Sequence, residues 1–159
     1  MDEVTRFERH YRLARTIHGA LFSSGLMAFL ISYLFSHAMS VSLVSAAEHG
    51  ALRRTIYGVA FGVSIGVIVL RRWLLGAGRM GRLAAQRGVE GVVAHLVKGT
   101  ILLGVMSEAV ILLGLGVSLF TRVFEDMWRL GGIGLILLLY TSPRRSSWHR
   151  AMERARQSL

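Results

Sequence analysis

Residues 99–121 read GTILLGVMSEAVILLGLGVSLFT, and Glu108 is the only charged side chain among these 23 residues. A helix needs about 20 predominantly apolar residues to cross about 30 Å of hydrocarbon. The stretch therefore predicts a membrane-spanning helix, which we place at residues 97–120. The composition agrees, because 53% of the residues are hydrophobic and only 18% are charged, which is too apolar for an ordinary soluble domain of this size.

Two earlier stretches predict two further spans. The 32 residues from Thr16 to Ala47 contain no Asp, Glu, Lys or Arg, and we place a span at residues 18–39. The 16 uncharged residues between Arg54 and Arg71 are short for a span. Arginine side chains at both ends can extend it by reaching the headgroups, so we place this span at residues 55–75.

A fourth span is expected near the C-terminus. Only 14 uncharged residues separate Arg129 from Arg144, so this span must begin near Phe124 and is placed at residues 124–141. Glu125 and Arg129 then lie at the surface, and their i,i+4 spacing allows them to pair.

Basic residues predict the orientation of these spans. The N-terminal segment contains four Lys or Arg, the connection from Arg71 to Arg87 contains five, and the tail from Arg144 contains five, whereas the other two connections contain two each. Because cytoplasmic segments of membrane proteins are enriched in Lys and Arg, both termini and the middle connection are expected in the cytoplasm. The sequence thus predicts an all-α, polytopic protein of the inner membrane, with four transmembrane helices.

The two ends of the chain are predicted to contact lipid. Residues 1–17 form a basic amphipathic segment, and residues 143–159 form a basic cytoplasmic tail. Such segments bind the lipid bilayer and its anionic lipid head groups. We therefore expect these flanking regions to hold the protein against the cytoplasmic leaflet.

Glu108 is the residue that carries chemistry in this interpretation. It lies ten residues after Lys98, about 15 Å along a helix, and so near the middle of the bilayer. Hydrocarbon favours the neutral form of a carboxyl group, and the sequence offers no Lys or Arg at a similar depth in the membrane to offset its charge. We expect Glu108 to carry a proton at rest and to release it only when water or a cation arrives, with the hydroxyls of Ser64 and Ser24 as partners at similar depth.

Glycines predict where helices pack closely. Gly58, Gly62 and Gly66 form two overlapping GxxxG steps on one face of the second span, and Gly104 lies one turn before Glu108. Small residues at this spacing allow another helix to approach. The sequence leaves open whether that helix belongs to the same chain or to a second one.

Residues 55–120 resemble the hairpin of the c subunit, or proteolipid, of rotary ATPases. That family has a glycine-rich helix, a polar cytoplasmic loop and a second helix with the pattern E-A-x-x-x-x-G-L around its ion-carrying carboxylate. Glu108, Ala109, Gly114 and Leu115 match this pattern. The first and fourth spans have no counterpart in that hairpin, and residues 71–90 lack its Arg-Gln-Pro turn.

The resemblance implies a function for the chain. It implies a small c-subunit-like membrane protein in which Glu108 binds a proton or Na⁺, and which forms a homo-oligomer or a subunit of a larger membrane complex. The alternative is an accessory or scaffold subunit without transport activity, in which Glu108 and the glycine face hold helices together.

Other classes of function find no support in the sequence. The net charge of +10 is divided among clusters between apolar runs, so we expect no nucleic-acid partner. The chain has no cysteine, and no pair of histidines has the i,i+3 or i,i+4 spacing of a helical metal site. No serine has a base and an orienting acid at suggestive spacing. We therefore expect no enzyme activity, no metal and no cofactor.

Overall fold

The computed structural model describes residues 3–38 and 46–157, and this part of the chain is helical with short connections. Its five helices are α1 (Glu3–Ala38), α2 (Ala46–Leu74), α3 (Ala77–Thr121), α4 (Phe124–Thr141) and α5 (Arg145–Gln157). The predicted all-α class is confirmed.

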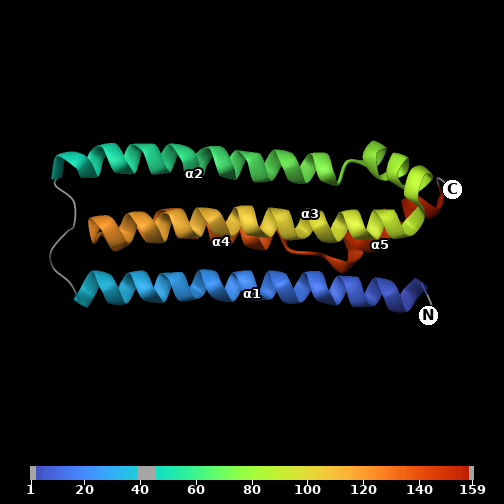
Figure 1. Ribbon diagram of the computed structural model, residues 1–159, viewed down its shortest axis with the longest axis horizontal. Helices are drawn as coiled ribbons and strands as arrows, with labels where there is room; N and C mark the ends of the chain where they lie inside the picture. Colours follow the sequence, from blue (N-terminus) through green and yellow to red (C-terminus); the bar gives the residue numbers. More distant parts are fainter. Residues whose placement is uncertain (1–2, 39–45, 158–159) are drawn as a thin grey trace.

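The four longer helices run alternately in opposite directions (Figure 1). Both chain termini lie at the same end of the bundle as the connection between α2 and α3, and α5 also lies there. We call this the terminal end. The connection between α3 and α4 lies at the opposite end, which we call the far end.

Helices α3 and α4 form the centre of the bundle. In the described chain α1 and α2 each pack against α3 and α4 rather than against one another. Figure 1 accordingly shows α1 and α2 on opposite sides of α3. One buried cluster joins α2 to the central pair through residues such as Val67, Val110 and Leu137, and another joins α1 to it through Ala28, Ile111 and Leu138.

Helix α3 contains a kink at Gly88. This residue has φ 63° and ψ −170°, a conformation that glycine adopts at little cost because it has no Cβ. Residues 77–87 of α3, which precede the kink, lie at the terminal end (Figure 1) and pack with α1 and α5. Phe7, Ala84 and Trp148 belong to the buried cluster that joins these three helices. Because α1 begins at Glu3, the described part of the basic N-terminal segment is the first part of this helix, and α5 packs against it.

Within residues 3–38 and 46–157, three helical segments are long and apolar enough to cross a membrane. They are Phe7–Ala38, Gly50–Leu74 and Gly88–Thr121. Their exposed surfaces carry large apolar side chains, among them Leu34, Phe61 and Val105, which suits contact with lipid tails. This finding confirms the prediction of transmembrane helices in a membrane-embedded protein. Helix α4, at 18 residues with Glu125, Asp126 and Arg129 in its first two turns, is not among the three candidates.

Candidate functional site

Glu108 lies on α3 at the border between its buried and its exposed faces. The preceding Ser107 and the following Ile111 are completely buried, whereas Val105 and Leu112 are about half exposed, at 50% and 52%. Glu108 itself is half-buried. Its carboxyl group is therefore presented to the flank of α3 rather than enclosed between helices.

Glu108 makes no hydrogen bond or ion pair with any residue in the described part of the chain. Neither of the two hydroxyl groups expected to bond to Glu108, those of Ser64 and Ser24, does so. Ser64 donates to the backbone oxygen of Ala60 on its own helix at 2.7 Å, and Ser24 is exposed on α1. The carboxyl group is thus free to meet water, an ion or a second protein molecule.

The glycines of α2 face open space. A Cβ added at Gly58 or at Gly62 would meet no atom within 4 Å, and one at Gly66 would only touch the end of Met106 at 3.7 Å. Gly104 on α3 is different, because a Cβ there would lie 2.8 Å from Leu21 of α1. Gly104 therefore makes room for α1 within the chain, whereas the faces of Gly58 and Gly62 remain uncovered.

Helices α3 and α4 approach one another closely at Gly114 and Gly134, neither of which was predicted from the sequence to be a packing position. A Cβ at Gly134 would lie 2.4 Å from Ile111 Cγ1 and 3.0 Å from the backbone oxygen of Ser107. A Cβ at Gly114 would lie 3.0 Å from the backbone nitrogen of Gly131. These positions fix the central pair of helices, and with it the orientation of the segment that carries Glu108.

A polar cluster at the far end was also missed. Asp126, in the first turn of α4, is only 2% exposed. Its Oδ2 accepts hydrogen bonds from Arg53 Nε of α2 at 2.8 Å and from Thr121 Oγ1 of α3 at 3.1 Å, and its Oδ1 accepts one from the Tyr57 hydroxyl at 3.0 Å. The cluster ties α2, α3 and α4 together where the chain turns.

Two further polar contacts hold α1 against the central pair. The hydroxyls of Ser32 and Ser118 are 2.5 Å apart, and both side chains are buried. His18 Nε2 lies 2.7 Å from the backbone oxygen of Leu138. His18 thus has a structural hydrogen bond, and within residues 3–38 and 46–157 no three metal-binding side chains gather.

The sequence contained a signal for the far-end cluster. The count of basic residues placed the connection that contains Arg53 on the same side of the membrane as the start of the fourth span, where Asp126 lies, so a pair between them was geometrically allowed. Comparisons of the chain with family models, with curated proteins and with solved structures found no match.

Proposed function

We propose that this chain is a multi-pass protein of the inner membrane with four spans and with both termini in the cytoplasm. The three apolar helices support membrane insertion. Helix α4 lies among them, beside α3. Asp126 is paired with Arg53, and Glu125 with Arg129, so the charges of α4 are neutralised near the far end. The rest of α4, from Leu130 to Thr141, is uncharged.

Within this membrane domain, we propose that Glu108 binds and releases an ion, as the c-subunit-like pattern implies. The observation that carries this proposal is the position of Glu108 on the outer flank of α3 without a hydrogen-bond partner in the described chain. A carboxyl group that served only to hold this bundle together would be bonded to a neighbouring helix. A lone intramembrane carboxyl group at the surface of a helix instead suits exchange with the surroundings.

The ion that this geometry favours is a proton. A Na⁺ ion would need several further oxygen ligands, and in the described part of the chain no polar side chain is bonded to Glu108. Ser107 donates to the backbone oxygen of Leu103 at 2.8 Å, and Ser64 donates to that of Ala60. A proton needs no ligand besides the carboxylate, whereas Na⁺ would need oxygens from water or from a second copy of the chain.

The second candidate is an accessory or scaffold subunit without transport activity. It is favoured by the open faces of Gly58 and Gly62, which a helix of another molecule could cover. In this case Glu108 would bond to the neighbouring molecule, and the chain would act as a homo-oligomer or as part of a larger membrane complex.

Reconstitution in lipid vesicles separates the two candidates. Proton flux through vesicles that contain the purified full chain, or the complex with which it purifies, is compared among wild type, Glu108→Gln and Glu108→Asp. Glu125→Gln is the matched control, because Glu125 is an exposed carboxylate at the far end. Assembly is measured in parallel by analytical ultracentrifugation.

The ion-carrier proposal expects Glu108→Gln to abolish flux with assembly unchanged, while Glu125→Gln behaves like wild type. If Glu108→Gln and Glu108→Asp both conduct like wild type and Gly62→Leu disrupts assembly, the scaffold candidate replaces it.

A further inference from the structure

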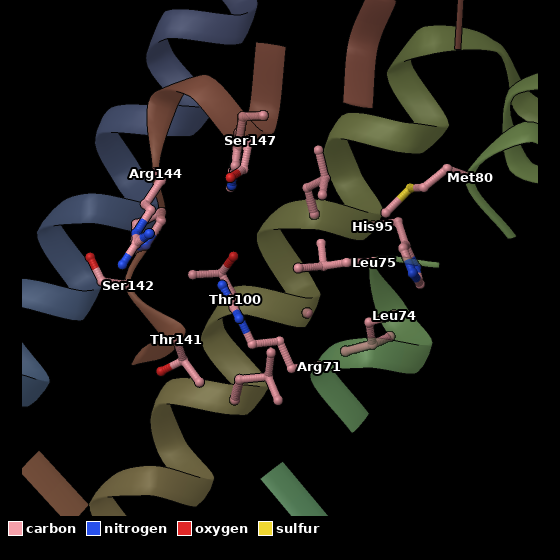
Figure 2. Close-up of a pocket in the computed structure, with 15 residues that line it drawn as sticks. Arg71, Leu74, Leu75, Met80, His95, Thr100, Thr141, Ser142, Arg144 and Ser147 are labelled. Atoms are coloured by element: carbon pink, nitrogen blue, oxygen red, sulfur yellow. The ribbon is translucent and has the colours of Figure 1, made fainter. Parts of the chain in front are cut away.

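A pocket lies toward the terminal end of the bundle, between the ends of α2 and α4, the start of α5, and the part of α3 that follows its kink (Figure 2). Its empty volume, which includes space open to solvent, is about 490 Å³. Arg71 comes from the last turn of α2, Thr141 from the end of α4, and Ser147 from the first turn of α5. The pocket is thus at the level where the apolar helices end and the basic segments begin.

Three polar side chains of this pocket offer hydrogen-bond donors without acceptors, whereas Thr141 donates to its own helix. Figure 2 shows Arg71 reaching across the pocket with its nitrogen atoms toward Thr100. Its guanidinium stacks on the ring of Tyr140, 4.0 Å from the ring centre. In the described chain neither Arg71 nor the hydroxyls of Thr100 and Ser147 has a side-chain hydrogen bond.

His95 lines both this pocket and a neighbouring one. Within the described part of the chain its Nε2 has no hydrogen-bond partner, but this atom is shielded from solvent and so does not open onto either pocket. The donors of the site are therefore those of Arg71, Thr100 and Ser147.

The charged side chains that line the two pockets are all basic. Arg71 and Arg144 line the pocket, and Arg72, Arg79 and Arg82 line the neighbouring one. No Asp or Glu lines either pocket. The start of α5 borders the pocket as well, and the N-terminus of a helix favours anions.

The rest of the lining is largely apolar. Leu74, Met80, Leu103 and Trp148 are buried in it, whereas Leu75 is 41% exposed. A phosphate group matches the cluster of donors, and an acyl chain matches the exposed apolar surface to which Leu75 belongs. We propose that this pocket binds an anionic membrane phospholipid, whose phosphate group accepts hydrogen bonds from Arg71 and from the hydroxyls of Thr100 and Ser147. The site is separate from Glu108, so its occupation does not depend on ion binding there.

Native mass spectrometry of the full chain in detergent micelles tests this proposal. Phosphatidylglycerol and phosphatidylcholine are added in turn, and the bound lipids are counted for wild type, Arg71→Gln, Thr100→Val and Arg12→Gln. Arg12 is the matched control, because it is an exposed arginine of α1 that lies outside the pocket lining. Inorganic phosphate at millimolar concentration is added in a further arm.

Wild type should bind phosphatidylglycerol more tightly than phosphatidylcholine. Arg71→Gln should weaken phosphatidylglycerol binding about tenfold, as expected for one hydrogen bond between charged groups. Thr100→Val should weaken it by a smaller factor, and Arg12→Gln and Glu108→Gln should leave it unchanged. Inorganic phosphate should not displace the lipid.

Three results would overturn the proposal. An equal loss in Arg12→Gln and Arg71→Gln would mean diffuse attraction to a basic surface. Equal binding of the two lipids would mean that the net negative charge of the head group is not recognised, because phosphatidylcholine carries the same phosphate group together with a choline cation. Displacement by inorganic phosphate would mean a site for soluble phosphate. Should Arg71→Gln fail to fold, Thr100→Val and Ser147→Ala carry the same test, because both remove only a hydroxyl.

Discussion

Removal of either partner of the Arg53–Asp126 pair should destabilise the protein, but to different extents. The side chain of Asp126 is 3% exposed, whereas that of Arg53 is 38% exposed. After Asp126→Ala, water reaches the remaining guanidinium. After Arg53→Met, the remaining carboxylate stays buried without its cation. We therefore expect Arg53→Met to lower the free energy of unfolding more than Asp126→Ala does.

The hydrogen bonds of the cluster set the magnitudes. Loss of one partner of a buried ion pair costs about 3–5 kcal/mol. Arg53→Met should lower the free energy of unfolding by about 3 kcal/mol, the lower end of this range, because Asp126 still accepts hydrogen bonds from Tyr57 and Thr121. Asp126→Ala should cost about 1–2 kcal/mol, because Arg53 becomes hydrated and Thr121 keeps its bond to the backbone oxygen of Val117.

Equilibrium unfolding in mixed micelles, followed by far-ultraviolet circular dichroism, measures both values. The double variant should cost less than the sum of the single ones, because the interaction can be lost only once. Arg54→Met is the control, since Arg54 is exposed on the next position of α2 and should change stability by about 0.5 kcal/mol or less. Additive single effects, or an equal loss in Arg54→Met, would refute the role assigned to the pair.

Three further predictions concern packing and topology. Gly134→Ala should lower the free energy of unfolding by about 2–3 kcal/mol, because its Cβ would meet backbone atoms of α3 that cannot move aside. Gly62→Ala should not lower the free energy of unfolding. Equal losses in the two variants would contradict the α3–α4 packing. Ser32→Ala should cost about 1–2 kcal/mol, because it leaves the buried hydroxyl of its partner on α3 without a hydrogen bond, and a neutral result would contradict that contact. In this cysteine-free chain, a membrane-impermeant thiol reagent should label the Gly50→Cys variant in intact cells and the Gln86→Cys variant only after permeabilisation, and the reverse pattern would overturn the proposed orientation.

Local patterns in the sequence predicted that four apolar segments are helical, but α2 begins at Ala46 and α3 at Ala77, well before the apolar stretches placed at residues 55–75 and 97–120. The fourth stretch was placed at residues 124–141, and α4 runs from Phe124 to Thr141. The pairing of Glu125 with Arg129 is confirmed at 3.1 Å, because residues four apart on a helix are neighbours whatever the rest of the fold does. Helices and the pairs on their surfaces depend on residues that are close together in the sequence, so the sequence alone predicts them.

Contacts between distant segments could not be predicted in the same way. Arg53 and Asp126 are 73 positions apart, and only the packing of α2 beside α4 brings them together. The glycines show the same limit. GxxxG spacing identified a face of α2, but Gly58 and Gly62 meet nothing there, whereas Gly114 and Gly134 form the close contact of the central helices. The spacing of glycines shows that one face of a helix lacks large side chains, and the fold determines which helix packs against that face.

Glu108 itself was selected from the sequence because a lone carboxyl group in an apolar stretch is costly. Its depth along the helix followed from the residue count. Its position on the flank of α3, at the border of the buried face, depends on how α1 and α4 pack against α3 and so required the fold.

Infrared spectroscopy of the protein in lipid vesicles tests the ion-binding proposal most directly. The difference spectrum between wild type and Glu108→Gln isolates the carboxyl group of Glu108, and Glu125→Gln provides the same comparison for an exposed carboxylate. A proton carrier should show a protonated carboxyl band at neutral pH that disappears in Glu108→Gln and diminishes reversibly as the pH is raised. If the difference spectrum shows only an ionised carboxylate at neutral pH, or a protonated band that no change of pH removes, Glu108 does not exchange a proton within the membrane and the proposal is wrong.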